Sequence, residues 1–363
     1  MAEHIHKPKD TVGDRYRVVR FAGSGGMQEV YEAVDLAFNR TVALKVPKNP
    51  SAKKRFARSA EMSARVTHPN VARTLDYMAI GETFYLVEEF VNGVDLQVRL
   101  NTEFQYFDPH LAAHMIHHLA KGVAACHHAD VFHRDLKPSN VMVSKDASFR
   151  LIKLTDFGIA KMAEAEIDEV MEDATEESIT GSQTVVGALP FMAPELISAP
   201  REATKAADVW SLGAILFYLL FGEKPFGAGG LKVVARILNE DLPPLASVVK
   251  LKGKQFDPLV SELWSIVETC MRKDAGQRPT ADGLVEILSK VCYSTAERQV
   301  GTIYNYHINR ADWGFIGTPS GENYFFHKDS YYGEAPADGL KVIFAPFEGR
   351  PRARAFPVLP LKN

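Results

Sequence analysis

The sequence predicts an α+β protein with three successive parts: a small sheet lobe with one helix, a larger helical lobe and a small all-β domain. Three observations predict this order. Short β-branched and aromatic runs separated by Gly, Asn and Pro fill residues 15–90. Longer windows with helical periodicity follow from residue 95 onward. Beyond residue 296, aromatic residues alternate along strand-like segments between glycine-rich turns, and we expect no helix there.

The composition of the chain is that of an ordinary globular protein. Of its 363 residues, 46% are hydrophobic and 24% are charged, which excludes a wholly disordered chain. The formal net charge of −3 gives no bulk attraction to nucleic acid or to anionic membranes, so any such partner must meet a local surface.

The 3 cysteines are scattered and favour neither a disulfide framework nor a zinc site. No signal peptide is recognisable, and the longest apolar run, residues 210–221, is too short to span a bilayer. We therefore expect a cytoplasmic protein without a membrane partner.

Turn signals and periodicity divide the chain into segments. Residues 1–10 are expected to form a tail, 11–91 the sheet lobe, 92–292 the helical lobe, 293–298 a linker and 299–363 the β domain. The sheet lobe should contain one helix, over residues 53–66. The helical lobe should contain helices near 111–127, 206–221, 258–271 and 281–291.

A glycine-rich turn lies between two predicted strands, at Gly23-Ser24-Gly25-Gly26. Glycines let backbone N–H groups approach phosphate oxygens closely, although a hairpin turn without a ligand would also explain this pattern. The next strand carries Lys45, whose ammonium group could reach the same phosphates. Three further motifs follow in order: His133-Arg-Asp135-Leu-Lys137-Pro-Ser-Asn140, Asp156-Phe-Gly158 and Ala193-Pro-Glu195. Their conjunction favours a phosphate-handling enzyme.

With these motifs, residues 11–292 resemble the eukaryotic-type protein kinase family, which has a bilobal fold. The lysine two residues after the aspartate is typical of the serine/threonine form of the catalytic loop. The resemblance implies ATP and Mg²⁺ as cofactors. It also implies transfer of the γ-phosphate to Ser or Thr hydroxyl groups of protein substrates.

The resemblance also implies a role for each matched residue. Asp135 would accept the proton of the substrate hydroxyl and Lys137 would steady the transferring phosphoryl group. Lys45 would hold the α- and β-phosphates, while Asn140 and Asp156 would hold the metal ions. The remaining ATP contacts would be Gly23, Ser24, Gly25 and Gly26 at the phosphates, Val30, Ala43 and Met142 around adenine, and the backbone of Glu89 and Val91 at its edge. Asp208 and a Glu195–Arg278 pair would be architectural.

The chain departs from the family pattern around Lys45. The helix position that usually carries the glutamate partner of this lysine is Ser59, whereas the residue just before the hinge, usually apolar, is Glu88. Glu61 lies about 200° around the helix from Ser59 and should face elsewhere. We hypothesise that Glu88 pairs with Lys45 from the sheet, because a buried unpaired charge is strongly unfavourable. The alternative is that Glu88 points to water or pairs with another residue.

Two other departures bear on the catalytic rate. Gln28 replaces the third glycine of the turn, and Ala188 replaces a threonine that usually touches the catalytic aspartate. Together with Ser59 they support an alternative function, a nucleotide-binding scaffold with little transferase activity whose C-terminal domain docks protein or nucleic acid.

The activation segment, residues 159–192, is long and acidic. Between residues 162 and 186 it carries 8 acidic residues and no Lys or Arg. In kinases switched by phosphorylation of this segment, a residue in the position of Arg134 receives the phosphate. We therefore expect autophosphorylation at Thr180 and Ser182. A solvated insert, or a short docked helix, would also explain the acidic run.

In the C-terminal part, Trp313 and Phe315 share one face of a predicted strand, and Phe325 and His327 share one face of another. The aromatic side chains could form a barrel core or an exposed platform on which unpaired bases stack. Intervening glycines and nearby arginines favour the platform. Residues 299–363 resemble a cold-shock domain, a five-stranded barrel of the oligonucleotide-binding (OB) fold. The resemblance implies single-stranded RNA or DNA as a partner, with Tyr306, Trp313, Phe315, Phe325 and His327 as candidate contacts. A protein-docking or structural role is the alternative.

Overall fold

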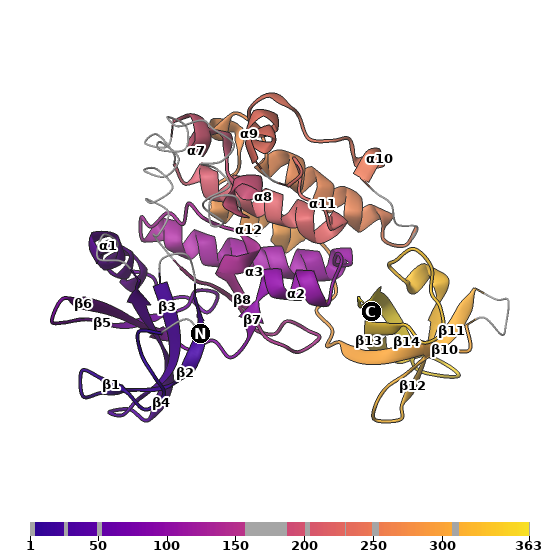
Figure 1. Cartoon of the computed structure of the whole chain (residues 1–363). Helices are drawn as coiled ribbons and strands as arrows, with labels where there is room; N and C mark the ends of the chain where they lie inside the picture. Colours follow the sequence, from indigo (N-terminus) through magenta and orange to yellow (C-terminus); the bar gives the residue numbers. More distant parts are fainter. Residues whose placement is uncertain are drawn as a thin grey trace.

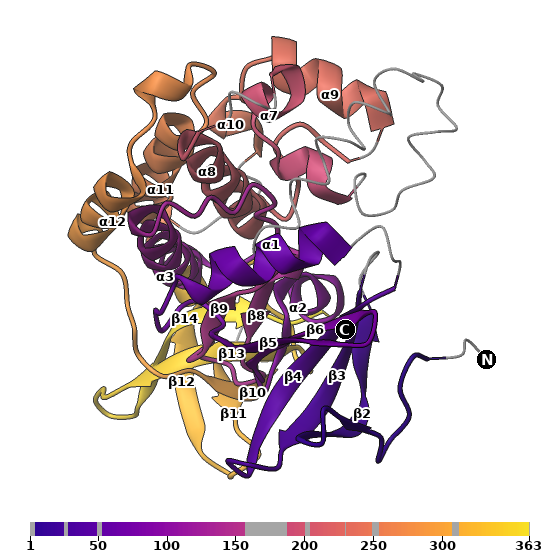
Figure 2. The same cartoon turned by 90° about the vertical axis from the view of Figure 1, so that its left-hand side faces the viewer.

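The computed structural model describes residues 4–24, 28–48, 53–156, 187–199, 204–228, 230–248, 254–306 and 312–362. The chain folds into the three parts that the sequence predicts: a sheet lobe, a helical lobe and a barrel (Figure 1). Helix α1 lies between the sheet and the helical lobe, as Figure 2 shows.

The sheet lobe is built on a six-stranded antiparallel sheet with the order β1-β2-β3-β4-β6-β5. Its strands are β1 (Thr11–Val12), β2 (Tyr16–Ser24), β3 (Gln28–Asp35), β4 (Arg40–Pro47), β5 (Thr74–Ile80) and β6 (Thr83–Glu89). The strands alternate between two faces. On one face Tyr31, Leu44 and Val87 form a small core, and on the other Leu86 packs against Phe56 of helix α1 (Lys53–Ala64).

The N-terminal segment, expected to be a tail, lies against the sheet lobe from residue 4 onward. The backbone N–H of His6 donates to the hydroxyl of Tyr31 at 3.0 Å, and the His6 ring contacts the hydroxyl of Tyr85 at 3.1 Å. The N–H of Ile5 donates to Glu29 Oε2 at 3.0 Å. This segment has no apolar periodicity, so its docking could not be predicted from the sequence pattern.

The helices of the helical lobe are α2 (Leu96–Thr102), α3 (Pro109–His128), α7 (Pro194–Ser198), α8 (Ala206–Phe221), α9 (Gly230–Asn239), α10 (Leu245–Val248), α11 (Asp257–Cys270) and α12 (Ala281–Lys290). The lobe contains the four helices that the sequence predicts, as α3, α8, α11 and α12, whereas α2, α7, α9 and α10 were not predicted. Short 3₁₀ turns are η2 (Pro138–Asn140), η3 (Leu189–Phe191) and η5 (Ala275–Gln277), and the small sheet is β7 (Val94–Asp95), β8 (Val141–Val143) and β9 (Ile152–Leu154). Helix α8 has mostly apolar residues on all sides, as expected for a helix buried among others.

The C-terminal domain is a closed barrel with the strand order β10-β11-β12-β14-β13. The strands are β10 (Gln299–Tyr304), β11 (Trp313–Gly317), β12 (Asn323–His327), β13 (Lys341–Phe347) and β14 (Arg354–Pro360), with the 3₁₀ turn η6 (Lys328–Ser330) after β12. β12 and β14 are parallel, and the other pairs are antiparallel. Ile303, Ile316, Phe326, Phe344 and Val358 fill the barrel.

The barrel packs directly on the helical lobe (Figure 1). The ring of Tyr332 meets that of Phe256 edge-on at 4.9 Å, and Phe356 stacks on Phe256 at 5.4 Å. In the predicted linker, Arg298 forms a two-pronged ion pair with Asp108, with N–O distances of 2.6 and 3.0 Å. Both side chains are buried, so residues 293–298 act as a docking segment rather than a loose connection.

Candidate active site

The ion pair between Lys45 and Glu88 connects two strands of the sheet lobe. Lys45 Nζ lies 2.5 Å from Glu88 Oε2, and their side chains are 7% and 4% exposed. Ala43 is directly opposite Glu88 in the β4–β6 register, so Lys45, two residues further on, is a diagonal neighbour on the same face. The pairing that we hypothesised from the sequence is therefore present. Glu61 is exposed and bonds Arg65, as expected, while the side chain of Ser59 lies outside the described residues.

Asp156 joins this pair from the segment after β9. Its Oδ1 accepts a hydrogen bond from Lys45 Nζ at 2.8 Å and a second from Gln28 Nε2 at 2.8 Å. Asp156 has a positive φ of 60°, which L-residues rarely adopt outside turns and functional sites. The sequence marked Gln28 only as a replaced glycine. That its amide reaches Asp156 depends on how β3 and the segment after β9 approach each other.

The charges of this cluster follow from burial and contact. Burial acts to lower the pKa of Lys45, but Asp156 and Glu88 outweigh it, so the pKa is raised. Burial raises the pKa of Glu88, and Lys45 offsets this only in part. Burial also acts to raise the pKa of Asp156, but contacts with Lys45 and Gln28 lower it. Asp156 is therefore the more firmly ionised carboxylate, as a cation ligand requires.

A second cluster lies in the loop before β8. Lys137 Nζ contacts both carboxylate oxygens of Asp135, at 3.0 and 2.8 Å, and Asn140 Nδ2 donates to Asp135 Oδ2 at 2.9 Å. The turn η2 folds Asn140 back towards Asp135. The Asn140 carbonyl accepts hydrogen bonds from the backbone and hydroxyl of Thr155, the residue before Asp156. This backbone link connects the two clusters.

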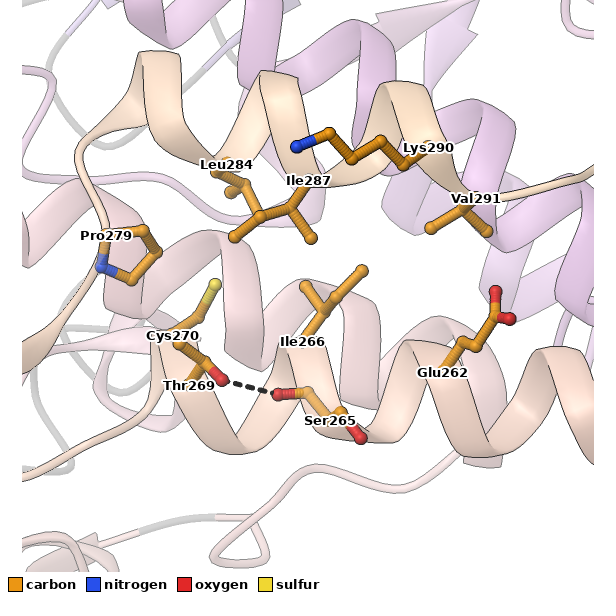
Figure 3. Close-up of a pocket in the computed structure, with 10 residues that line it drawn as sticks. All are labelled: Glu262, Ser265, Ile266, Thr269, Cys270, Pro279, Leu284, Ile287, Lys290 and Val291. Carbon is orange, nitrogen blue, oxygen red and sulfur yellow. Dashed lines mark hydrogen bonds between the residues drawn. The ribbon is translucent and has the colours of Figure 1, made fainter.

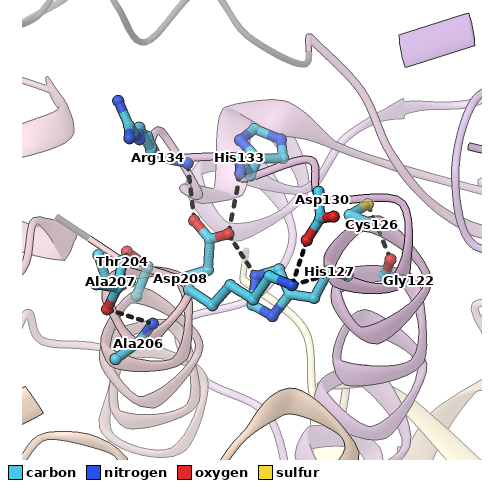
Figure 4. A network of polar contacts seen from close by, with 12 residues as sticks. Gly122, Cys126, His127, Asp130, His133, Arg134, Thr204, Ala206, Ala207 and Asp208 are labelled. Atoms are coloured by element: carbon cyan, nitrogen blue, oxygen red, sulfur yellow. Dashed lines mark hydrogen bonds and ion pairs between the residues drawn. The ribbon is translucent and has the colours of Figure 1, made fainter. Parts of the chain in front are cut away.

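Asp208 organises the backbone of this loop from helix α8. Its carboxylate accepts hydrogen bonds from the N–H groups of His133 and Arg134, at 2.9 and 2.7 Å, and from His127 at 2.8 Å (Figure 4). Arg134 has a positive φ of 59°, a conformation that these bonds help to hold. His133 in turn contacts the carbonyl of Thr155 at 3.0 Å. Asp208 thus has the architectural position expected for it.

The predicted ion pair between Glu195 and Arg278 is also present. The two Arg278 N–O distances to the carboxylate are 2.6 and 2.9 Å, and the guanidinium group also donates to the carbonyl of Ala206 at 3.0 Å. The pair ties the start of α7 to the segment before α12 and to the start of α8. Its position is structural rather than catalytic.

The candidate adenine contacts come from both lobes. Val30 is opposite Lys45 in the β3–β4 register, Ala43 is on β4, and Met142 is on β8. At the hinge, the N–H of Glu89 donates to the carbonyl of Arg73, and the carbonyl of Val91 accepts from Gly93. Gly23 and Ser24 end β2. Gly25, Gly26, Thr180 and Ser182 lie outside the described residues.

Comparison with known proteins decides the family. Residues 16–288 match the family model described as "Protein kinase domain", which is most of the chain. The chain belongs to the protein kinase family. The match contains both clusters of the kinase site and ends before the barrel.

Curated relatives of this kinase are serine/threonine protein kinases of bacteria. PknA of Mycobacterium tuberculosis is 34% identical over 246 residues, which cover 65% of this chain and 53% of PknA. PkaA of Streptomyces coelicolor is 35% identical over 257 residues, 69% of this chain and 43% of PkaA. The probable kinase pknA2 of Bifidobacterium longum is 30% identical over 284 residues, 76% of this chain and 34% of pknA2. The chain thus spans about a third to a half of the length of these relatives.

A solved structure shares the kinase fold. The crystal structure of Rad53 in complex with AMP-PNP superposes with a TM-score of 0.58 and 21% sequence identity, covering 75% of this chain and 64% of the Rad53 chain. This likeness confirms the bilobal fold that the sequence predicted.

Two kinds of feature are absent from the described residues. No helix among them is long and apolar enough to cross a membrane. The described residues also contain no group of three or more His, Cys, Asp or Glu that is placed to hold a metal ion. A kinase metal site does not require such a group, because Mg²⁺ is commonly held by one or two protein oxygen ligands together with nucleotide phosphates.

A groove outside the kinase site lies between α11 and α12 (Figure 3). Its volume is about 360 Å³, and Ile266, Cys270, Leu284, Ile287 and Val291 are among its lining residues. None of the lining residues is one of the predicted site residues.

The barrel carries an aromatic face, which we define as Tyr304, Trp313, Phe315, Phe325 and His327. Trp313 is opposite His327 and Phe315 opposite Phe325 in the β11–β12 register. The ring of Tyr304 stacks on that of Phe315 at 5.7 Å. All five side chains are partly exposed.

Tyr306, another candidate nucleic-acid contact, is also partly exposed but packs differently. Its ring stacks on the buried Phe326 at 5.9 Å and covers Gly314, so it packs against the barrel core. Tyr304, which was not one of the candidate contacts, lies on the face through its register with Phe315. The strand turns after Tyr304, and simple alternation along the sequence does not show where that turn begins.

Two arginines of the barrel extend the aromatic face. The guanidinium group of Arg352 lies 5.3 Å from the ring centre of Phe315, and that of Arg354 lies 5.8 Å from that of Phe325. Arg354 is opposite Phe325 on one side and the exposed Phe347 on the other. The row Tyr304–Phe315–Phe325–Arg354–Phe347 therefore crosses all five strands.

Proposed function

We propose that this protein is a serine/threonine protein kinase that uses ATP and Mg²⁺. The observation that carries the proposal is the meeting of Lys45, Glu88 and Asp156 beside the Asp135–Lys137–Asn140 cluster. The segments that supply these residues are far apart in the sequence, and, apart from Glu88, each residue has the type that phosphoryl transfer needs. The names of the curated relatives support the serine/threonine class.

Asn140 and Asp156 supply hard oxygen ligands of the kind that Mg²⁺ prefers. The amide nitrogen of Asn140 already donates to Asp135 Oδ2 and to the Asp135 carbonyl, so the amide oxygen is the atom suited to a cation. When bound, Mg²⁺ neutralises charge on the nucleotide phosphates. Lys45, held by two carboxylates, would contact the α- and β-phosphates. The Glu89 carbonyl and the Val91 N–H would bind the adenine edge. The Glu89 N–H is already bonded to the Arg73 carbonyl, and the Val91 carbonyl already accepts from the Gly93 N–H.

Asp135 would orient the substrate hydroxyl and accept its proton. The hydroxyl oxygen then forms a bond to the γ-phosphorus as the bond from that phosphorus to the β–γ bridging oxygen breaks, and ADP leaves. Lys137, within 3.0 Å of both Asp135 oxygens, is placed to stabilise the negative charge of the transferring group.

Radiolabelled ATP with a generic basic protein substrate tests the proposal. Wild-type protein should transfer label, whereas Asp135→Ala and Asp156→Ala should not. Glu61→Met, a change on the exposed face of α1, should leave transfer unchanged. Nucleotide binding without transfer by the wild type would instead support the scaffold alternative, which Gln28 and Ala188 suggest.

We propose autophosphorylation of the activation segment at Thr180 and Ser182. Arg134, adjacent to the catalytic aspartate, is the expected receptor of the phosphate. Mass spectrometry of protein produced with and without Asp135→Ala tests this. Sites that the enzyme modifies itself should disappear in the variant, and their persistence would assign them to another kinase.

For the barrel we propose binding of single-stranded RNA or DNA, as its resemblance to a cold-shock domain implies. When β10 to β14 are numbered 1 to 5 along the chain, neighbouring strands of the barrel follow the order 1-2-3-5-4, and strand 4 pairs with strand 1 to close it. This is the strand order of the OB fold, which supports the resemblance. Docking on the helical lobe uses Tyr332 and Phe356, so the aromatic face remains available to a partner. Arg352 and Arg354 supply positive charge beside rings that can stack on bases.

Fluorescence anisotropy with labelled oligo-dT and oligo-U at several salt concentrations tests the barrel proposal. Trp313→Ala should weaken binding about 5- to 150-fold, because stacking contributes roughly 1–3 kcal/mol per base. Phe38→Ala removes an exposed aromatic ring from the sheet lobe and should have no effect. Affinity should fall as salt increases if phosphates are contacted. Binding that ignores both Trp313 and salt would contradict the proposal.

A further inference from the structure

The side chain of Gln28 has a position that a glycine could not fill. Gln28 is the first residue of β3 after the glycine-rich turn, and it is only 6% exposed. Its amide nitrogen donates to Asp156 Oδ1 at 2.8 Å. The start of β3 and the candidate metal ligand are therefore joined by a side chain.

The contact occupies one oxygen of the carboxylate that the proposed function assigns to a cation. Asp156 Oδ1 accepts hydrogen bonds from both Gln28 and Lys45, so its two lone pairs are engaged. Mg²⁺ binds carboxylate oxygens at roughly 2.0–2.1 Å in near-octahedral geometry. An N–H group directed at the same oxygen cannot remain in place when the ion binds through it. Lys45 can exchange Asp156 for nucleotide phosphates, whereas the Gln28 amide must find another partner.

The backbone near Gln28 is held in place, so the exchange falls to its side chain. Gln28 is opposite Pro47 in the β3–β4 ladder. The adjacent Glu29 is buried, and its carboxylate accepts hydrogen bonds from the Ile5 N–H and from the hydroxyl of Tyr31. Release of Asp156 therefore requires rotation of the Gln28 side chain rather than displacement of the strand.

We propose that Gln28 is a positioning residue that competes with Mg²⁺ for Asp156. In the nucleotide-free enzyme its amide fastens the start of β3 to Asp156, and the contact is given up when Mg²⁺–nucleotide binds. This inference rests on the proposed function, because it takes the site to bind Mg²⁺–ATP. It predicts that the enzyme needs more Mg²⁺ than a form in which residue 28 cannot donate a hydrogen bond.

The experiment measures binding rather than turnover. Anisotropy of N-methylanthraniloyl-ADP is followed as MgCl₂ is titrated into the wild type, Gln28→Leu and Gln28→Gly. Leucine removes the hydrogen-bond donor and keeps an apolar side chain, and glycine removes the side chain altogether. Gln277→Leu, an exposed position in η5, is the matched control. The half-saturating Mg²⁺ concentration should fall about tenfold in both Gln28 variants, a change of about 1.4 kcal/mol, and should not change in the control.

The outcomes separate the inference from the proposed function. If the wild type binds no nucleotide at any Mg²⁺ concentration, the proposed function fails and the inference fails with it. If nucleotide binds but the half-saturating Mg²⁺ concentration of Gln28→Leu is equal to or higher than that of the wild type, only the inference is overturned. A lower half-saturating Mg²⁺ concentration in Gln28→Gly but not in Gln28→Leu would also overturn the inference, because the backbone flexibility of glycine would then be the cause. Thermal unfolding of each variant checks that the fold is intact.

Discussion

Replacing Glu88 with methionine should loosen Lys45 from the sheet. Both side chains are buried and their charged atoms lie 2.5 Å apart. Methionine fills a similar volume but carries no charge, so the ammonium group loses one of its two carboxylate partners. The remaining partner, Asp156 Oδ1, lies 2.8 Å away and comes from the other side of the site.

The expected magnitude follows from the burial of the pair. Removing one partner of a buried ion pair generally destabilises a protein by about 3–5 kcal/mol. Since Asp156 still compensates Lys45, we expect the lower end of this range, about 3 kcal/mol in the free energy of unfolding. Nucleotide affinity should fall as well, because Lys45 will be drawn towards Asp156 and away from the phosphates.

Urea unfolding and nucleotide titration measure the two effects. Glu61→Met is the matched control: Glu61 is 66% exposed and pairs with Arg65, just beyond the end of its helix, so its loss should change stability by less than about 1 kcal/mol. A double-mutant cycle with Lys45→Met should show strong coupling for Glu88 and none for Glu61. If Glu88→Met retains the stability and nucleotide affinity of the wild type, the positioning of Lys45 from the sheet is refuted.

Three further perturbations test the fold. Arg298→Met leaves Asp108 buried without its partner and should lower the free energy of unfolding by about 3–5 kcal/mol in urea titrations. Burial lowers the pKa of His118 from 6.5 to about 4. The unfolded chain therefore takes up this proton at higher pH than the folded chain, so the melting temperature should fall as pH decreases from 6.5 towards 4, and less steeply in His118→Asn. Gly222→Ala places a side chain at φ 70° with its Cβ 2.4 Å from the carbonyl of Gln105, and chemical unfolding should show a loss of more than about 2 kcal/mol.

Each of these changes has a control. Arg150→Met breaks an exposed pair with Glu297 and should have an effect below about 1 kcal/mol, so an equal loss at Arg298 and Arg150 would contradict the role of burial. Gly321 has a φ of 88° with nothing within 4 Å of an added Cβ, so Gly321→Ala isolates backbone strain. If Gly222→Ala lowers the free energy of unfolding no more than Gly321→Ala does, the clash with Gln105 has no energetic cost and the prediction is wrong. A pH profile of His118→Asn identical to that of the wild type would exclude His118 from the acid response.

Much of this protein was predictable from local pattern. The order of strands and helices follows hydrophobic periodicity, and the catalytic motifs are short segments whose residue types are set by phosphoryl transfer. Asp135, Lys137 and Asn140 lie within six residues, so a single turn brings them together. The Asp208 and Glu195–Arg278 contacts were also expected, because the family resemblance fixes them.

The sequence determined which residues are available for the site, and the tertiary structure determined which of them meet. The pairing of Glu88 with Lys45 was one of two alternatives until the β4–β6 register placed both on one face. The contact from Gln28 to Asp156 joins residues 128 positions apart, and no local pattern encodes such a separation. The docking of the barrel could not be predicted for the same reason. Its strands were recognisable in the sequence, but its docking depends on the ion pair between Arg298 and Asp108, which are 190 residues apart. Burial and charge compensation are properties of the assembled fold, so they could be assigned only once the segments were packed together.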